Sequence, residues 1–225
     1  EARRGFFLAM GGKHDPTQIS GRLGNPFFVI DPGLHIKRYP CAILIHPAIR
    51  AAIELAQAQD LNPEQIKRLE IGVSEVVTST LNHPKPTTGL EGKFSVAFPL
   101  ALALLERKVA LADFTDERVN DPKIKALMKK VTVRTEPRVQ ESGANEVTAH
   151  LSLYLQDDRR FERLATLERG KAQKWISASD LKEKFHACAA RVLPKEQVER
   201  ALDLLLRIEI GGSVDSLMEV VRTRT

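Results

Sequence analysis

The clearest strand pattern in the chain lies at residues 147–155, where apolar and polar side chains alternate one by one. A period of two places the apolar side chains on one face of a sheet, so the pattern predicts a half-buried strand. The polar run 156–159 predicts a turn, and residues 161–168 predict a partner strand. Together these segments predict an antiparallel hairpin.

Helical spacing of apolar side chains predicts helices around further strand segments. Pro47 suits the first turn of a helix that runs to about residue 59. Residues 94–106 are apolar on all sides, which predicts a buried helix that starts or kinks at Pro99. The other predicted elements are strands at 66–77 and 131–133, a helix at 121–130 and a loop at 79–92. Helices packed on one face of a mostly antiparallel sheet predict an α+β fold.

The two ends of the chain differ from this middle part. Residues 1–45 are rich in glycine and proline and show little periodicity, with short helices predicted only at 6–10 and 18–23. Residues 176–225 predict amphipathic helices, the last of them capped by Ser213. The first segment lacks the periodicity to form a core of its own, which indicates that it belongs to a larger unit.

Composition and charge narrow the function classes. The 225 residues are 43% hydrophobic and 28% charged, a globular balance, and no apolar run is long enough to span a membrane. The net charge is +5, and residues 1–50 carry seven Lys or Arg against three Asp or Glu. Nucleic-acid binding favours a concentrated basic face with interleaved aromatics, whereas aromatics are only 5% here. A small acidic ligand fits this composition better than a nucleic acid.

The stretch from Lys37 to Pro47 contains the first candidate site. Two cations, Lys37 and Arg38, precede an apolar run that ends at a helix start, where unpaired backbone N–H groups and the helix dipole favour an anion. His46 occupies the predicted N-cap position and could act as an acid or base on a bound carboxylate. The alternative is a surface Lys-Arg pair and a histidine that only caps the helix.

The loop 83–95 contains the second candidate site. Lys93 lies just before the predicted buried helix, and Ser95 is a candidate N-cap. A basic residue beside a helix start again suits an anion. The alternative is a capped core helix next to a solvated lysine.

The remaining polar residues predict structural or solvent roles. The histidines are His14, His35, His150 and His186. The acidic residues Asp113, Asp116, Glu117 and Asp121 are expected to cap helices and to form a solvated face. Cys41 and Cys188 lie far apart in the sequence; they could pair, but they do not resemble a disulfide framework or a thiolate metal site, so a reducing cytoplasm is expected. No metal-ligand spacing, dinucleotide-binding motif or Walker loop occurs in the sequence.

Five motifs occur in one order along the chain. They are Lys37-x-Tyr39-Pro40, His46-Pro47-Ala48-Ile49, Gly89-Leu90-Glu91-x-Lys93-Phe94-Ser95, Ala112-Asp113-Phe114-Thr115-Asp116-Glu117-Arg118-Val119 and Asp180-Leu181-x-Glu183-Lys184-Phe185. This series resembles the MmgE/PrpD family, which includes 2-methylcitrate dehydratase, cis-aconitate decarboxylase and iminodisuccinate epimerase. The resemblance extends from residue 5 to the last predicted helix and is specific to the family rather than to one activity.

The resemblance implies an all-helical domain and an α+β lid domain with an antiparallel sheet, with the site in the cleft between them. The lid would comprise residues 37–175, and residues 1–36 and 176–225 would belong to the helical domain. Family members are much longer, and this chain resembles their C-terminal half. The helices at its ends are therefore expected to expose apolar faces.

The resemblance also assigns candidate site residues. The family's lysine before the Tyr-Pro pair falls on Lys37, its histidine at the helix start on His46, and its basic residue before Phe-Ser on Lys93. Lys37 and His46 are the catalytic candidates. The substrate-binding candidates are Lys93, Arg38 and Ala48. Animal-type decarboxylases resemble this stretch but carry an additional histidine where this chain has Ala42, which weighs against decarboxylation.

The resulting hypothesis is a lyase of the 2-methylcitrate dehydratase type, part of propionate metabolism, that uses no metal or cofactor and acts on a small di- or tricarboxylate. Cations and N–H groups contribute most where negative charge develops on the substrate. The alternatives are an epimerase, isomerase or decarboxylase of the same family, or a non-catalytic remnant. The expected partners are a small carboxylate and a second copy of the chain, or association through exposed helical faces, with no nucleic acid and no membrane, in the cytoplasm.

Overall fold

The computed structural model of the chain describes residues 15, 17, 23, 24, 27, 29–81, 83–140, 146–168 and 176–222. The strands are β1 (Ile66–Val73), β2 (Val131–Thr135), β3 (Glu146–Leu155) and β4 (Arg160–Glu168). The α-helices are α2 (His46–Ala58), α3 (Glu75–Thr80), α4 (Gly89–Gly92), α5 (Ala97–Glu106), α6 (Asp116–Val119), α7 (Pro122–Met128), α8 (Pro137–Gln140), α10 (Ala178–Ala189), α11 (Lys195–Leu206) and α12 (Val214–Val221). A π-helical turn, η2 (Val29–Gly33), and the 3₁₀ turns η3 (Ile43–Ile45), η4 (Pro63–Gln65), η5 (Leu111–Asp113) and η6 (Ile208–Ile210) connect them.

One four-stranded sheet has the strand order β2-β1-β3-β4. Strand β1 pairs in parallel with β2, whereas the β1–β3 and β3–β4 pairs are antiparallel. Leu153 lies opposite Leu69 on one side and Phe161 on the other, so the apolar positions of three strands share one face. The predicted hairpin and the α+β fold with a mostly antiparallel sheet are confirmed.

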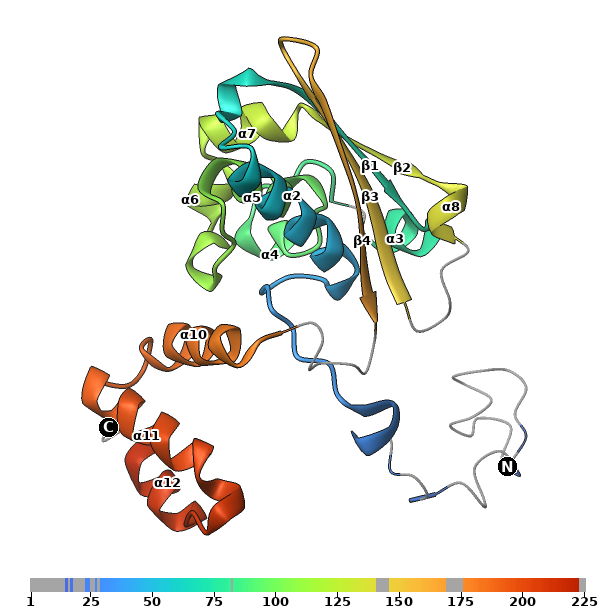
Figure 1. The fold of residues 1–225 in the computed structure, drawn as a ribbon. Coiled ribbons are helices and arrows are strands. Elements are labelled where there is room, and N and C mark those ends of the chain that lie inside the picture. Colours follow the sequence, from blue (N-terminus) through green and yellow to red (C-terminus); the bar gives the residue numbers. More distant parts are fainter. Residues whose placement is uncertain are drawn as a thin grey trace.

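Helices α2, α5 and α7 lie on one side of this sheet (Figure 1). The core between helices and sheet includes the fully buried side chains Ile49, Leu69, Ile71, Phe98, Leu100, Leu102, Ile124, Leu151 and Leu153. Helix α5 is buried from Ala97 to Leu104, and Pro99 lies in its first turn, where its missing N–H breaks no helical hydrogen bond. The prediction of a helix that is apolar on all sides and starts near Pro99 is confirmed.

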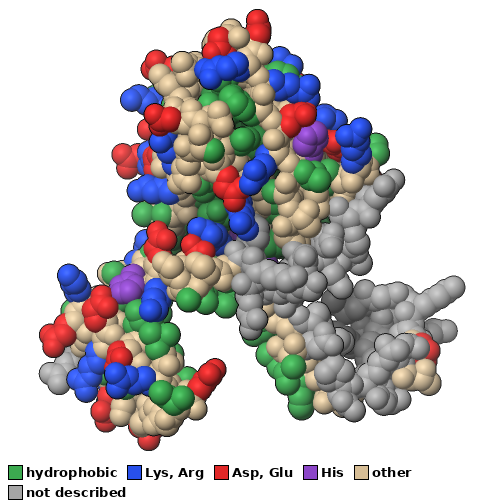
Figure 2. Space-filling model, in the orientation of Figure 1, with side chains coloured by type: hydrophobic (Ala, Val, Ile, Leu, Met, Phe, Trp, Pro, Cys, Tyr) green, Lys and Arg blue, Asp and Glu red, His purple; other side chains and the backbone are tan. Residues whose placement is uncertain are grey.

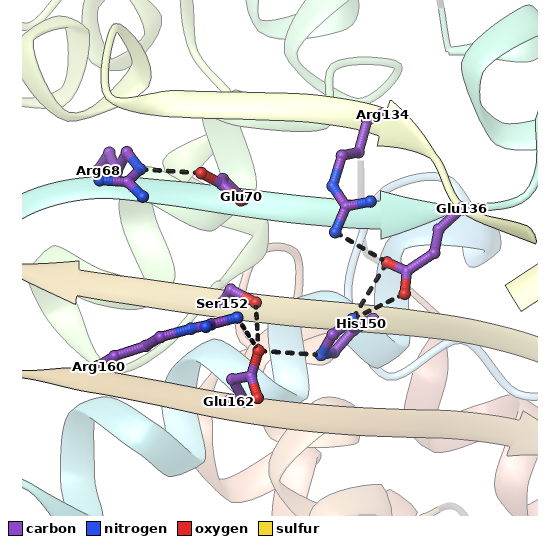
Figure 3. Close-up of polar contacts among 8 residues, drawn as sticks. All are labelled: Arg68, Glu70, Arg134, Glu136, His150, Ser152, Arg160 and Glu162. Atoms are coloured by element: carbon purple, nitrogen blue, oxygen red, sulfur yellow. Dashed lines mark hydrogen bonds and ion pairs between the residues drawn. The ribbon is translucent and has the colours of Figure 1, made fainter. Parts of the chain in front are cut away.

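The opposite face of the sheet is mostly polar, with Leu164 as an exposed apolar side chain beside His150. His150 Nδ1 lies 3.0 Å from the Glu136 carboxylate, which Arg134 approaches at 3.3 Å (Figure 3). The other ring nitrogen of His150 lies 3.8 Å from Glu162, and Glu162 also pairs with Arg160. The arginines and glutamates drawn in Figure 3 therefore each have a partner of opposite charge, and the predicted place of His150 on the polar face is confirmed.

The C-terminal helices α10, α11 and α12 lie apart from the α/β body, which we define as the described residues of 37–168, and approach it through α10 (Figure 1). Few of their residues are buried: none in α10, Val198 and Ala201 in α11, and Val220 in α12. Their exposed apolar side chains include Leu181, Val192, Leu205, Leu206, Ile208, Ile210, Val214 and Met218. Figure 2 shows apolar side chains at the surface of this part. The expectation of exposed apolar faces is confirmed for these helices.

Two predicted boundaries are wrong. Strand β1 ends at Val73 rather than at residue 77, because the backbone becomes helical from Glu75, the first residue of α3. The predicted loop 79–92 contains α4, which forms because Thr88 and Glu91 make a capping box. The short helices predicted at 6–10 and 18–23 lie largely outside the described residues. No helix in the described part of the chain has the length and apolar character that crossing a membrane requires.

Candidate functional site

The segment that precedes α2 turns from the surface into the core. Lys37 is exposed, whereas Tyr39 and Cys41, two and four residues later, are buried. The backbone N–H of Ala42 donates to the carbonyl of Lys93 at 3.0 Å. The two candidate stretches of the sequence are thus joined by their backbones at Ala42 and Lys93.

His46 is completely buried at the start of α2. Its predicted position as N-cap is wrong: Ile45 is the N-cap, and the 3₁₀ turn η3 leads directly into the helix, so that the His46 N–H donates to the Ile43 carbonyl. The imidazole packs edge-on against the Tyr39 ring at a centroid distance of 5.2 Å. Burial lowers the pKa of His46 to about 3, partly offset by hydrogen bonds with the backbone of Cys41 and Tyr39. The side chain is therefore a neutral imidazole at physiological pH and cannot donate a proton as an imidazolium acid.

The pKa of the Cys41 thiol reflects the charges near this segment. Burial raises the pKa of its thiol to about 12, and the positive charges of Lys37 and Lys93 oppose that rise. Both lysines therefore lie within electrostatic range of one buried sulfur. The Lys37 charge also acts on His46, where it favours the neutral imidazole.

A cleft of about 680 Å³ lies between the α/β body and α10. Its walls come from four segments: residues 37–40, the polar side of α2, residues 107–111 after α5, and α10. The charged lining residues are Lys37, Arg38, Arg50, Arg107, Lys108 and Lys184, against Glu54, Asp180 and Glu183. With six cations against three carboxylates, the cleft favours an anionic ligand. Charged side chains are visible in Figure 2 where α10 meets the body.

Several of these cations already have acidic partners. Arg38 makes a two-pronged ion pair with Asp180, with N–O distances of 2.8 and 2.7 Å. Arg50 pairs with Glu54 at 2.7 Å. Burial would raise the pKa of Glu54, but hydrogen bonds and charge from Arg50 and Arg163 outweigh it and hold that pKa below its usual value. Arg38, a predicted substrate-binding residue, therefore binds a carboxylate of the protein itself.

The structure divides the predicted site residues into two groups. Lys37 and Arg38 line the cleft. His46, Ala48 and Lys93 do not line it, and both His46 and Ala48 are fully buried. The solvent-exposed catalytic candidate is thus Lys37, whereas His46 and Ala48 at the start of α2 are buried.

Four cations of the cleft were not among the predicted site residues: Arg50 on α2 and the three that follow. Arg107 ends α5 in a left-handed conformation with a φ of 55°, Lys108 follows it, and Lys184 lies on α10. A cation pair directly after a buried helix is a readable signal, because it falls where the helix leaves the core. Nothing in the sequence shows that α10 lies opposite this pair.

The described residues contain no cluster of three or more His, Cys, Asp or Glu side chains that could hold a metal ion. Two of the acidic residues predicted to cap helices, Asp121 and Asp113, do so. Asp121 accepts from the N–H groups of Lys123 and Ile124 at the start of α7, and Asp113 accepts from the N–H of Ala110 at 2.6 Å.

Comparison with known families matches residues 39–209 to the MmgE/PrpD C-terminal domain. Among curated proteins, the chain is 26% identical over 214 residues to the cis-aconitate decarboxylase of Homo sapiens and 24% identical over 209 residues to that of Mus musculus. The cis-aconitate decarboxylase of Aspergillus terreus is 22% identical over 198 residues. The three alignments cover 93%, 90% and 84% of this chain but only 43%, 42% and 40% of the respective relatives. The chain therefore spans less than half the length of the curated relatives it matches.

Proposed function

This chain belongs to the MmgE/PrpD family, and on that premise we propose that it forms part of a metal-independent lyase acting on a small di- or tricarboxylate. The reaction we propose is dehydration of the 2-methylcitrate type. The observation that carries the proposal is the cationic cleft with the exposed Lys37 in its wall.

The charge of the cleft supports a ligand with more than one carboxylate. Arg38, Arg50 and Arg107 have protein carboxylates as partners, and Lys184 donates to the Lys37 carbonyl. Among the described residues this leaves Lys37 and Lys108 as the lining cations whose side chains make neither kind of contact. A ligand with carboxylates at both ends could pair with both lysines at once. The volume of about 680 Å³ is ample for such a small acid.

Dehydration next to a carboxylate places a specific demand on the protein. A base removes the proton on the carbon beside the carboxylate, and the bonding electrons move into an enolate-like unit. They then form a carbon–carbon double bond as the hydroxyl group leaves and takes up a proton to become water. An ammonium held beside that carboxylate stabilises the developing charge, and this is the role we propose for Lys37.

The environment of His46 limits what it can contribute. With a pKa of about 3, the buried imidazole is neutral, so it does not serve as the acid that protonates the leaving hydroxyl group. Its edge-on contact with Tyr39 supports a role in holding the segment that bears Lys37. We therefore assign the proton transfers of the reaction to residues other than His46.

Decarboxylation is the second candidate reaction, because the curated relatives are named cis-aconitate decarboxylases. It needs the same stabilisation of charge beside a carboxylate, but it releases CO₂ instead of water. Animal-type decarboxylases resemble this stretch but carry a histidine at the position of Ala42. The alanine at this position therefore favours dehydration. Incubation with 2-methylcitrate and with cis-aconitate, followed by mass spectrometry, distinguishes loss of water from loss of CO₂.

Thermal unfolding with citrate tests the binding step. A ligand at a hundred times its Kd stabilises the folded state by about 2.7 kcal/mol, so citrate is expected to raise the Tm by several degrees. Lys37→Ala should remove the shift. Lys67→Ala is the matched control, because Lys67 is exposed and pairs with Asp158 far from the cleft. No shift at millimolar citrate would favour a non-catalytic remnant.

A further inference from the structure

Helix α10 contacts the segment that bears Lys37 at two points. The guanidinium of Arg38 makes its two-pronged ion pair with Asp180, in the first turn of α10. One helical turn later, Lys184 Nζ donates to the backbone carbonyl of Lys37 at 2.5 Å. The two contacts lie on the same side of the helix, because residues four apart share a face.

Asp180 is itself held in place. It forms a capping box with Ser177, accepting from the Ser177 N–H at 3.0 Å, while its own N–H donates to the Ser177 hydroxyl at 3.1 Å. The carboxylate therefore has a fixed direction from the helix before it meets Arg38. Burial would raise the pKa of Asp180, but the hydrogen bonds from Ser177 and the charges of Arg38 and Arg50 keep it low, so the carboxylate is ionised.

The contacts continue inward from Arg38. Its guanidinium lies 5.8 Å from the centre of the Tyr39 ring, which in turn packs edge-on against His46. Residues 34–42 form no helix or strand, so backbone ladders do not fix the direction of Lys37. The described contacts that reach the Lys37–Arg38 pair from another element come from α10.

We propose that Asp180 and Lys184 are positioning residues that clamp the Lys37–Arg38 pair, so that the Lys37 ammonium stays in the wall of the cleft. Asp180 acts through Arg38, and Lys184 acts through the carbonyl of Lys37. The role of the clamp in ligand binding rests on the proposed function. Its existence can be tested without any ligand.

Two variants remove one contact each. Asp180→Asn keeps an acceptor for the Ser177 N–H and removes the charge that holds Arg38. Lys184→Met keeps the length of the side chain and removes the donor to Lys37. Asp203→Asn is the control for the first, since the ion pair of Asp203 among the described residues is with Arg207, four residues later at the end of α11. Lys182→Met, an exposed neighbour on α10, is the control for the second.

The first measurement uses the two native cysteines and no ligand. Cys188 is exposed on α10, whereas Cys41 is buried and follows Arg38 by three residues in the same segment. A thiol reagent followed by peptide mass spectrometry gives a separate labelling rate for each. Labelling of Cys41 is expected to be faster by about tenfold in both clamp variants, the scale of one charge-assisted hydrogen bond, and unchanged in both controls. Equal Cys41 rates in clamp and control variants would overturn the clamp.

The second measurement separates positioning from simple structural support. The citrate Kd is expected to rise about tenfold in Asp180→Asn and in Lys184→Met. Asp180→Glu, which retains the charge, should recover most of the affinity. Faster Cys41 labelling with an unchanged citrate Kd would overturn the positioning role. If the unmodified chain does not bind citrate, the proposed function fails, and the Cys41 rates alone then decide whether the clamp exists.

Discussion

The α/β body and the C-terminal helices use the same kinds of apolar side chain with opposite results. In the body, leucines and isoleucines of α2, α5, β1 and β3 are fully buried against one another. In α11 and α12, side chains such as Leu206 and Met218 are 60% exposed. The same amphipathic pattern thus makes a closed core in one region and an open apolar face in the other.

The difference shows that the signals that form a helix are separate from the burial of its apolar face. Helices α10 to α12 have good local signals, including the Ser177 capping box and the Ser213 cap. Packing of an apolar face, more than local propensity, stabilises helices in proteins. We therefore expect the body to unfold as the more stable unit and the C-terminal helices to open at lower cost.

A pair of matched leucine truncations should show the largest difference between the regions. Leu102→Ala removes a fully buried side chain of α5 and should cost about 3 kcal/mol of unfolding free energy. Leu206→Ala, at a position 60% exposed, should cost less than about 0.5 kcal/mol. Urea denaturation measures both. Equal losses would mean that Leu206 is buried in solution and that the contrast between the regions is wrong.

Protonation of the histidines should change the stability of the two regions in opposite directions as the pH falls. Burial lowers the pKa of His46 to about 3, so below pH 6.5 the unfolded chain binds a proton that the folded body does not. The body should therefore lose up to about 1.4 kcal/mol per pH unit as the pH falls below 6.5, until it approaches 3. Hydrogen bonds with the Lys182 carbonyl and Glu199 raise the pKa of His186. Its stabilising contribution is present below pH 6.5 and is lost as the pH rises through the folded pKa.

Unfolding measured from pH 7 to pH 5 tests this contrast, because carboxylates change little in that window. His46→Phe, which retains an aromatic ring beside Tyr39, should flatten the acid loss of the body. His186→Ala should affect only the amide exchange of α10 and α11. An unchanged acid slope in His46→Phe would contradict the burial of His46.

Helix caps give the smallest expected difference. Thr88 accepts from the Glu91 N–H at 3.2 Å in the body, and Ser213 accepts from the Ser216 N–H at 3.3 Å at the start of α12. Thr88→Ala should lower global stability by about 1 kcal/mol. Ser213→Ala should instead increase amide exchange within α12 alone, as hydrogen-exchange mass spectrometry can measure. A global loss from Ser213→Ala would show that α12 unfolds together with the body.

The sequence predicts most of the fold because periodicity is a local property. The strict alternation at 147–155 and the all-apolar run around Pro99 each determine their own structure. The errors occur where a short helix interrupts the pattern. Helix α3 begins at Glu75 inside a predicted strand, and the Thr88–Glu91 capping box folds one turn of helix inside a predicted loop.

The candidate site is less accessible to such reasoning. The sequence indicates Lys37 and His46 as neighbours of a helix start, but it does not show that η3 and Tyr39 close over the histidine. The cations of the cleft come from four segments: residues 37–40 and the neighbouring α2, and the distant residues 107–111 and α10. Only tertiary packing brings Arg107 and Lys184 to the same cleft as Lys37, so no motif contains them together.

Mapping citrate onto the chain by amide chemical shifts in NMR tests the central claim most directly. We predict saturable shifts at residues 37–40 and 107–111 and in α10, weakening with salt as expected for an ionic site and lost in Lys37→Ala. Shifts scattered over the surface, or the same shifts and affinity in Lys37→Ala, would contradict the account of the cleft as a carboxylate site.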